Sequence, residues 1–178
     1  MPKTAGVSIS HILKNYGIDN IGTQHSPLRE YRELIDKKDY DSLYKFCVVR
    51  NPWDLLISYY FSPHWAESKD PYFKEHPHDK LNSPDELIYY LKTDLQPLRY
   101  YISTDNKKGL IEEINYVIRF DNLEEDFKNV ERTLGINENL PVKNKSEHVH
   151  YREYYDEKLK NMVYEKFKEE IKFFNFEF

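Results

Sequence analysis

The segment from Pro2 to Ile9 combines a lysine, small residues and a glycine at the start of a helical pattern. It reads Pro-Lys-Thr-Ala-Gly-Val-Ser-Ile. Small residues let backbone N–H groups at a helix start face an anion, and Lys3 adds a full positive charge. The segment is not a Walker loop, because its lysine precedes the glycine and no Lys-Ser or Lys-Thr pair closes it. The pattern predicts a phosphate-binding loop, with a basic segment before a capped helix as the alternative.

A second segment, Arg50–Tyr59, directly follows a predicted buried strand. It reads Arg-Asn-Pro-Trp-Asp-Leu-Leu-Ile-Ser-Tyr, and its serine, Ser58, stands about two helical turns after the strand end. Ligands of open parallel sheets bind at the carboxyl ends of strands. Arginine can bind a phosphate through two parallel hydrogen bonds, and the Ser58 hydroxyl can add a donor. The alternative is an ion pair between Arg50 and Asp54 that ties the strand to the next helix.

Together these segments resemble the donor-binding motifs of sulfotransferases that use 3′-phosphoadenosine 5′-phosphosulfate (PAPS). Pro-Lys-Thr-Ala-Gly-x-Ser-Ile is similar to their 5′-phosphosulfate loop, and Val-Arg-Asn-Pro-Trp-Asp with Ser58 is similar to their 3′-phosphate motif. The resemblance is closest to the group that includes carbohydrate sulfotransferases. It continues through residues 116–123 and 144–146 to residues 151–155, and so spans nearly the whole chain.

The resemblance implies a role for each donor-binding position. Lys3 is expected to contact the bridging oxygen of the donor and to neutralise charge on the leaving phosphate. The following residues are expected to hold the 5′-phosphosulfate through backbone amides and hydroxyls: Thr4, Ala5, Gly6, Val7 and Ser8. Arg50 and Ser58 are expected to hold the 3′-phosphate. Lys145 and Ser146 lie in a looser match to a later loop that closes over the nucleotide.

Sulfuryl transfer also requires a group that removes the acceptor proton, and His25 is the expected base. Imidazole titrates near neutral pH, which suits proton transfer. His25 follows a strand predicted at Ile18–Gly22 and precedes Ser26, which is predicted to cap the next helix. Members of the family have a histidine at a similar point. A structural histidine is the alternative, and His64 is the second choice for the base.

The segments between these motifs alternate between predicted strands and helices. Strands are predicted at Lys45–Val49 and Asn115–Phe120. Helical spacing of apolar residues begins near Gly6, Pro27, Trp53, Ser83, Leu123 and Asp156. This alternation predicts one α/β domain over residues 1–178, a P-loop-like three-layer fold with a mainly parallel sheet flanked by helices. Residues 62–82 show no period and are predicted to form a long loop or lid.

Sulfotransferases of this kind normally have an apolar strand that leads into the Pro-Lys-Thr loop, and this sequence opens at Met1-Pro2 without it. A fold that lacks this first strand is expected to have unpaired strand edges and a mobile loop. Three interpretations stay open. The protein begins upstream, or a partner or another segment fills the gap, or the chain is a degenerate copy that binds the donor poorly.

Composition limits the classes of partner and location. The net charge is −5 with both signs mixed, so there is no general cationic field to attract nucleic acid. No stretch approaches the ~18 consecutive apolar residues of a membrane span, and no signal peptide pattern opens the sequence, so a soluble, cytoplasmic protein of bacterial type is expected. Cys47 is expected to be a small buried side chain and not a nucleophile. The aromatic and basic residues at 151–155 are expected to close over adenine or to pack the last helix.

The remaining expectations concern cofactors and alternative functions. His64, His76 and His78 lack a cysteine partner, so no metal site is expected. The resemblance implies PAPS as co-substrate, 3′-phosphoadenosine 5′-phosphate (PAP) as product, and an acceptor hydroxyl or amine on a small molecule, first of all a carbohydrate. Two other functions stay open: a non-catalytic nucleotide- or glycan-binding protein derived from the enzyme, and a nucleotide-phosphate kinase, which would need a Walker lysine and an acidic magnesium ligand. The sequence gives no indication of the oligomeric state.

Overall fold

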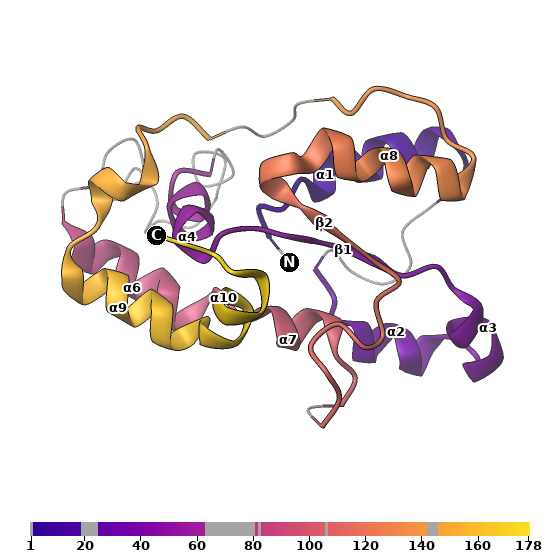
Figure 1. Cartoon of the computed structure of the whole chain (residues 1–178), viewed down its shortest axis with the longest axis horizontal. Helices are drawn as coiled ribbons and strands as arrows, with labels where there is room; N and C mark the ends of the chain where they lie inside the picture. Colours follow the sequence, from indigo (N-terminus) through magenta and orange to yellow (C-terminus); the bar gives the residue numbers. More distant parts are fainter. Residues whose placement is uncertain (1, 19–24, 63–80, 82, 106, 142–145) are drawn as a thin grey trace, which may run out of the picture. The chain divides into compact units, whose positions relative to one another are not determined.

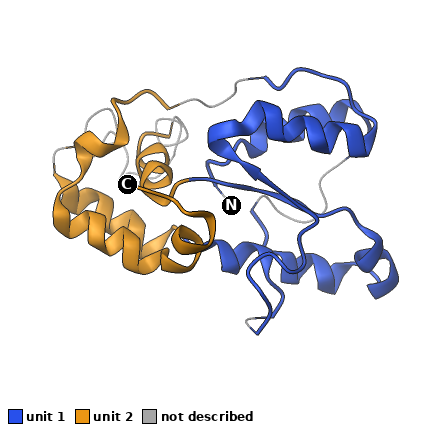
Figure 2. Ribbon diagram, viewed as in Figure 1, with its two compact units in different colours: residues 1–50, 96–141 blue, residues 51–95, 142–178 orange. Residues whose placement is uncertain are grey.

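The computed structural model describes residues 2–18, 25–62, 81, 83–105, 107–141 and 146–178 (Figure 1). The chain forms two compact units (Figure 2). Unit 1 comprises residues 1–50 and 96–141, and unit 2 comprises residues 51–95 and 142–178. Each unit is therefore assembled from two segments that are far apart in the sequence.

Unit 1 contains a parallel sheet of two strands, β1 (Phe46–Val49) and β2 (Tyr116–Arg119). The strands pair in register over their full lengths. The predictions of strands at Lys45–Val49 and Asn115–Phe120 are confirmed to within one residue at each end. Because the strands are parallel, both carboxyl ends lie at the same edge of the sheet, which is where ligands of such sheets bind.

Helices lie on both sides of this sheet (Figure 1). A short 3₁₀ helix, η2 (Phe120–Asn122), joins β2 to the helix that follows it. One side carries α1 (Gly6–Asn15) and α8 (Leu123–Leu134). The opposite side carries α2 (Leu28–Leu34), α3 (Lys37–Ser42) and α7 (Leu98–Ile102). The described part of unit 1 thus has the predicted mixture of helices and a parallel strand pair flanked by helices.

The core of unit 1 joins α1 and α8 to the two strands. Ile12, Ile118, Phe127 and Val130 are all buried in it. The apolar face predicted for residues 123–134 supplies two of these side chains, and removing this face from water stabilises the packing of α8 on the sheet. Gly135 ends α8 with a φ of 69°, a left-handed conformation that glycine adopts without a steric cost.

Unit 2 is helical in its described residues. Its elements are α4 (Pro52–Tyr60), α6 (Pro84–Thr93), η3 (Tyr151–Tyr154), α9 (Glu157–Lys166) and α10 (Lys168–Phe174). The Ser83 side chain accepts a hydrogen bond from the Asp85 amide (3.1 Å), so this residue caps α6 as predicted. Asn51 caps α4 in the same way, through a bond from the Trp53 amide (3.0 Å).

The structure differs from the predicted elements in several places. The predicted single tail helix is two helices that meet at Phe167, and the buried stripe of apolar residues continues across the break, so its spacing does not reveal it. Helices α3 and α7 were not predicted, because six and five residues are too few to show a periodic apolar face. Ile18 does not lie in a strand; residues 19–22 of that predicted strand, and residues 63–80 and 82 of the predicted loop, lie outside the described residues.

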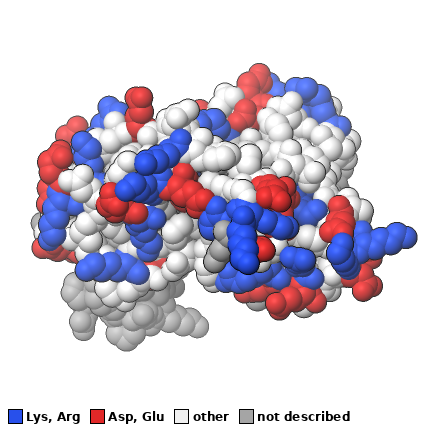
Figure 3. Space-filling view, turned by 60° about the horizontal axis from the view of Figure 1, so that its bottom comes forward, with Lys and Arg blue, Asp and Glu red and all other residues white. Residues whose placement is uncertain are grey.

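Charged side chains of both signs are distributed over the surface. In Figure 3 the Lys and Arg side chains are interspersed with Asp and Glu side chains across the visible face. Exposed ion pairs such as Lys37–Asp41 (2.6 Å) and Lys128–Glu125 (2.8 Å) lie along single helices, where each contributes little to stability. In the described ranges, no helix has the length and apolar character needed to cross a membrane.

Candidate functional site

The loop before α1 contains two residues in the left-handed region of backbone conformation. Lys3 has a φ of 56° and Ala5 has a φ of 58°. Thr4, between them, is 5% exposed, and Ser8 in the first turn of α1 is 4% exposed. Left-handed residues in a tight turn direct successive N–H groups to one side, which is the backbone shape of many anion-binding loops. The conformation of this loop therefore fits a phosphate.

The start of α1 also fits an anion. The residue at the cap position is Ala5, whose methyl group cannot accept a hydrogen bond from the first amides of the helix. A carbon placed at the Cβ position of Gly6 would meet no described atom within 4 Å, so the space beside this residue is open. An anion with several oxygens can occupy such a space and accept hydrogen bonds from the helix start.

Arg50 directly follows β1, and its guanidinium lies against this loop. Its Nη1 donates a hydrogen bond to the backbone oxygen of Lys3 (2.8 Å). The guanidinium carbon lies 4.0 Å from the centroid of the Phe120 ring, within the range of a cation–π interaction. Phe120 directly follows β2, so the two side chains come from the carboxyl ends of both strands. Arg50 is thereby held between the Lys3 loop and Phe120.

The Lys3 and Arg50 side chains place two positive charges close together. Burial of the Lys3 ammonium and, second, the positive charge of Arg50 lower the pKa of Lys3 from 10.5 to about 8. Both effects disfavour the charged form of the amine. A bound anion would favour that form again, so this pair has the electrostatics expected of an anion site.

Ser58 and Ser146 meet inside unit 2. Ser58 lies on α4 and is 1% exposed, and its Oγ is 3.2 Å from the Oγ of Ser146. The two residues come from separate predicted donor-binding motifs, 88 positions apart in the sequence. Lys145 lies outside the described residues. Arg50 belongs to unit 1 and Ser58 to unit 2, so the predicted 3′-phosphate motif is divided between the units.

His25 is an exposed residue of unit 1, two positions before Pro27, which stands at the cap position of α2, so the prediction that Ser26 caps this helix is wrong. Its φ is 68°, which is uncommon for a residue other than glycine. Conformations of this kind occur often at functional sites, where the surrounding structure maintains them. The role of His25 as a base stays a prediction. The second choice, His64, lies outside the described residues.

Comparison with known proteins shows the family of this chain. A model of the sulfotransferase family matches residues 8–177. The chain belongs to the sulfotransferase family. An uncharacterized protein of Archaeoglobus fulgidus is 31% identical over 118 residues, which are 63% of this chain and 84% of that protein. No solved structure gives a significant match.

The family match does not cover every predicted site residue of this sulfotransferase-family protein. It includes Arg50, Ser58 and Ser146, and it begins at Ser8. The residues from Lys3 to Val7 precede the matched region. Their candidacy therefore depends on the conformation of the loop and on the contact with Arg50, not on the match.

The aromatic segment at 151–155 packs within unit 2 of this sulfotransferase-family protein. The Tyr155 hydroxyl donates a hydrogen bond to the backbone oxygen of Trp53 (2.8 Å). The rings of Tyr151 and Tyr155 lie edge-on to the ring of Phe178. These contacts are with the start of α4 and with Phe178, which follows the last helix, α10, so the two roles expected for this segment stay predictions.

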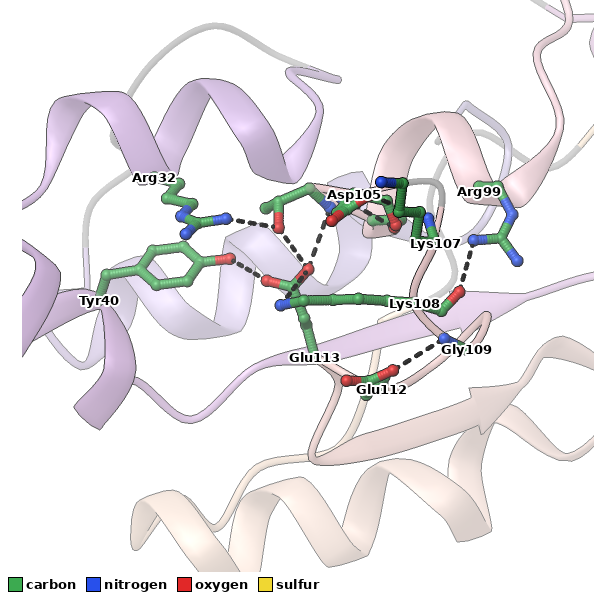
Figure 4. Close-up of polar contacts among 11 residues, drawn as sticks. Arg32, Tyr40, Arg99, Asp105, Lys107, Lys108, Gly109, Glu112 and Glu113 are labelled. Atoms are coloured by element: carbon green, nitrogen blue, oxygen red, sulfur yellow. Dashed lines mark hydrogen bonds and ion pairs between the residues drawn. The ribbon is translucent and has the colours of Figure 1, made fainter.

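A second polar cluster in unit 1 surrounds Glu113 (Figure 4). Its carboxylate accepts hydrogen bonds from the Tyr40 hydroxyl (3.1 Å), the Thr104 amide (3.1 Å) and the Thr104 hydroxyl (2.5 Å). The Lys108 ammonium lies 3.3 Å from it, and Arg32 donates to the Thr104 hydroxyl (2.9 Å). Burial acts to raise the pKa of Glu113, but the hydrogen bonds from Thr104, Lys108 and Tyr40 outweigh it, so the pKa lies below its usual 4.5. The cluster joins the loop after α7 to α2 and α3.

Cys47 and Phe120 lie on or directly after the two strands of unit 1. Cys47, expected to be buried, is only partly buried. Desolvation raises the pKa of its thiol to about 12, so the thiol stays protonated at neutral pH. Phe120, which lies under the Arg50 guanidinium, was not predicted; its position at the end of a predicted strand was the available signal. In the part of the chain that the structure describes, no three His, Cys, Asp or Glu side chains gather into a metal site.

Proposed function

We propose that this protein transfers a sulfuryl group from PAPS to an acceptor hydroxyl or amine. The observation that carries the proposal is the arrangement of Lys3 and Arg50, in which the Arg50 Nη1 lies 2.8 Å from the backbone oxygen of Lys3. Two cations held together where two parallel strands end suit a donor that carries phosphate at both ends of its ribose. Membership of the sulfotransferase family supports sulfuryl transfer as the reaction.

The proposal assigns the donor contacts to two groups of residues. The amides of residues 4–8 hold the 5′-phosphosulfate, and the buried hydroxyls of Thr4 and Ser8 add donors there. Arg50 contacts the 3′-phosphate, which distinguishes this donor from ordinary adenine nucleotides. Ser58, Ser146 and Lys145 are assigned to the nucleotide from the sequence resemblance, and the Ser58–Ser146 contact within unit 2 supports two of them.

In the proposed transfer step, His25 moves a proton and Lys3 stabilises a developing negative charge. PAPS, when bound, supplies an activated sulfuryl group. A bond forms between the acceptor oxygen and sulfur while the bond from sulfur to the bridging phosphate oxygen breaks. His25 accepts the acceptor proton, and the Lys3 ammonium neutralises the charge that develops on the departing phosphate oxygen. The loop amides hold the reacting groups in line, so little reorganisation is needed during the reaction.

Further parts of the proposal concern the acceptor, the fold and the location. The acceptor is a carbohydrate hydroxyl, as the sequence resemblance implies. Both units belong to one P-loop-like domain over residues 1–178. The protein acts in the cytoplasm without a nucleic acid partner; these points stay predictions.

The proposal is tested with PAPS that carries radioactive sulfur and a panel of mono- and oligosaccharides. We expect transfer of label by the natural sequence, no transfer by His25→Ala, and equal binding of PAP by both proteins. His11→Ala, which changes an exposed histidine on α1, is the matched control and should keep its activity. Full activity in His25→Ala would reject the base. Binding of PAP without transfer to any saccharide would favour the non-catalytic alternative, and magnesium-dependent turnover of ATP would favour a kinase.

A further inference from the structure

Glu177 and Phe178, hereafter the 177–178 segment, lie beside the start of α4 in unit 2 (Figure 1). The Asn51 Nδ2 donates a hydrogen bond to the backbone oxygen of Glu177 (2.7 Å). The Oδ1 of the same side chain accepts the bond from the Trp53 amide that caps α4 (3.0 Å). Both ends of one side-chain amide are therefore fixed, and they connect the 177–178 segment to the first turn of α4.

The Phe178 ring contacts two segments that are distant in the sequence. It lies edge-on to Trp53 at the start of α4, with ring centroids 5.6 Å apart. It also lies edge-on to Tyr151 (5.8 Å) and Tyr155 (5.4 Å), in and directly after η3. Edge-to-face pairs at such distances are favourable arrangements for aromatic rings. Phe178 thus holds the first turn of α4 and the η3 segment against one ring.

The first turn of α4 has further anchors in the same unit. The Trp53 indole Nε1 donates to the backbone oxygen of Lys160 (3.1 Å), and the backbone oxygen of Trp53 accepts from the Tyr155 hydroxyl (2.8 Å). Burial raises the pKa of Tyr155 well above its usual value of 10, so this hydroxyl remains a donor at all ordinary pH values. The start of α4 is consequently fixed at its cap, its main chain and its indole ring.

Both anchored segments carry residues that are proposed to bind the donor. Ser58 lies five residues after Trp53 on the same helix, and Ser146 lies five residues before Tyr151. A helix moves as a unit, so a shift of its first turn also moves a side chain one or two turns later. The 3.2 Å separation of the two serine hydroxyls therefore depends on the placement of both segments.

We infer that the 177–178 segment positions Ser58 and Ser146, and that it thereby determines the preference of this protein for a nucleotide with a 3′-phosphate. The inference rests on the proposed function, because it assumes that both serines contact that phosphate. Phe178 acts through Trp53 and Tyr151, and Glu177 acts through Asn51. They are positioning residues, distinct from the cations that are proposed to bind the donor directly.

The test compares PAP with adenosine 5′-phosphate (AMP), which lacks the 3′-phosphate, by calorimetry of the full chain. Phe178→Leu keeps an apolar side chain but removes the ring. Asn51→Asp keeps the oxygen that caps α4 but replaces the donor to Glu177 with a second oxygen. In both variants we expect the affinity for PAP to fall by about tenfold and that for AMP to stay unchanged, so the PAP to AMP ratio also falls about tenfold.

Phe173→Ala is the matched control, because Phe173 is an exposed ring on α10. It should keep the ratio of the natural sequence. An unchanged ratio in folded Phe178→Leu and Asn51→Asp would overturn the inference. Absence of PAP binding by the natural sequence would instead overturn the proposed function.

Amide hydrogen exchange tests the positioning itself without any nucleotide. We expect faster exchange at residues 52–58 and 146–155 in Phe178→Leu and Asn51→Asp, because both changes release the start of α4, and no change in Phe173→Ala. Exchange at these residues that matches the natural sequence would contradict the positioning role, whatever the nucleotide affinities are. This measurement therefore separates failure of the inference from failure of the proposed function.

Discussion

Two polar clusters in unit 1 have opposite effects on the ionisation of a side chain that they contain. Around Glu113, hydroxyl, amide and ammonium donors converge on one carboxylate and lower its pKa, which favours its charged form. At Lys3, burial and the neighbouring Arg50 lower the pKa of an amine, which disfavours its charged form. A charge surrounded by suitable donors stabilises the fold, whereas a charge held beside a like charge is favourable only when a ligand compensates it. The difference identifies the Glu113 cluster as structural and the Lys3–Arg50 pair as the candidate for binding.

The largest expected effect is on stability, from Glu113→Ala. Removing the carboxylate leaves the Tyr40 and Thr104 donors without their acceptor, so we expect the free energy of unfolding to fall by about 3 kcal/mol. Urea unfolding measures this change. Glu112→Ala is the control, because this exposed carboxylate loses a bond to the Gly109 amide (2.8 Å) and should cost only about 1 kcal/mol. Loss of PAP affinity in folded Glu113→Ala would contradict the separation of the two clusters.

Arg50→Ala is expected to weaken the binding of PAP by a free energy similar to the loss of stability in Glu113→Ala. It removes the hydrogen bonds proposed for the 3′-phosphate and the bond to the Lys3 oxygen, so PAP affinity should fall about 100-fold, or roughly 2.7 kcal/mol. Calorimetry measures the affinity directly. Arg132→Ala, an exposed arginine on α8, should bind PAP as the natural sequence does. Equal affinities in Arg50→Ala and Arg132→Ala would remove Arg50 from the site.

Lys3→Met should weaken the binding of PAP without lowering the stability of the unliganded protein. The variant keeps the backbone oxygen that accepts from Arg50 but removes a charge that burial and Arg50 disfavour. We expect PAP affinity to fall about tenfold while the unliganded protein is as stable as before or more stable. Thermal unfolding with and without PAP shows both effects. A less stable unliganded protein would mean that the Lys3 charge supports the fold, as the Glu113 charge does.

Changes of pH should affect the two clusters at opposite ends of the pH scale. The folded-state pKa of Lys3 is about 8 against 10.5 unfolded, so its unfavourable contribution is full below pH 8 and is relieved as pH rises toward 10.5. The folded-state pKa of Glu113 lies below 4.5, so its favourable contribution is full above pH 4.5 and is lost as pH falls through the folded value. Urea unfolding across pH should show a flatter alkaline limb in Lys3→Met and a flatter acidic limb in Glu113→Gln. If the stability of both variants depends on pH as that of the natural sequence does, at acidic and at alkaline pH, the pKa shifts assigned to Lys3 and Glu113 are contradicted.

The sequence predicted the elements whose signals are local. The β1 strand is a continuous apolar run, α6 has a serine cap followed by proline, and α8 has an apolar face. The break at Phe167 and the short α3 and α7 helices have no such signal. The division into two units also has no local signature, because each unit combines segments from both halves of the chain.

The candidate site was predictable as a set of residues but not as an arrangement. A lysine among small residues and an arginine at the end of a strand indicated an anion site, yet left-handed conformations at Lys3, Ala5 and His25 are uncommon for these residue types. The contact of Arg50 with Phe120 depends on the pairing register of β1 and β2, which no single segment encodes. The Glu113 cluster was missed because its members come from separate segments without a shared spacing.

Proton uptake on PAP binding tests the central claim most directly, namely that Lys3 beside Arg50 is an anion site for the nucleotide. Calorimetric titration at pH 8, in two buffers of different ionisation enthalpy, measures this uptake. Because the pKa of unliganded Lys3 is about 8, binding should take up about half a proton, and Lys3→Met should take up none. PAP binding with no proton uptake by the natural sequence, or with equal uptake by Lys3→Met, would contradict the account.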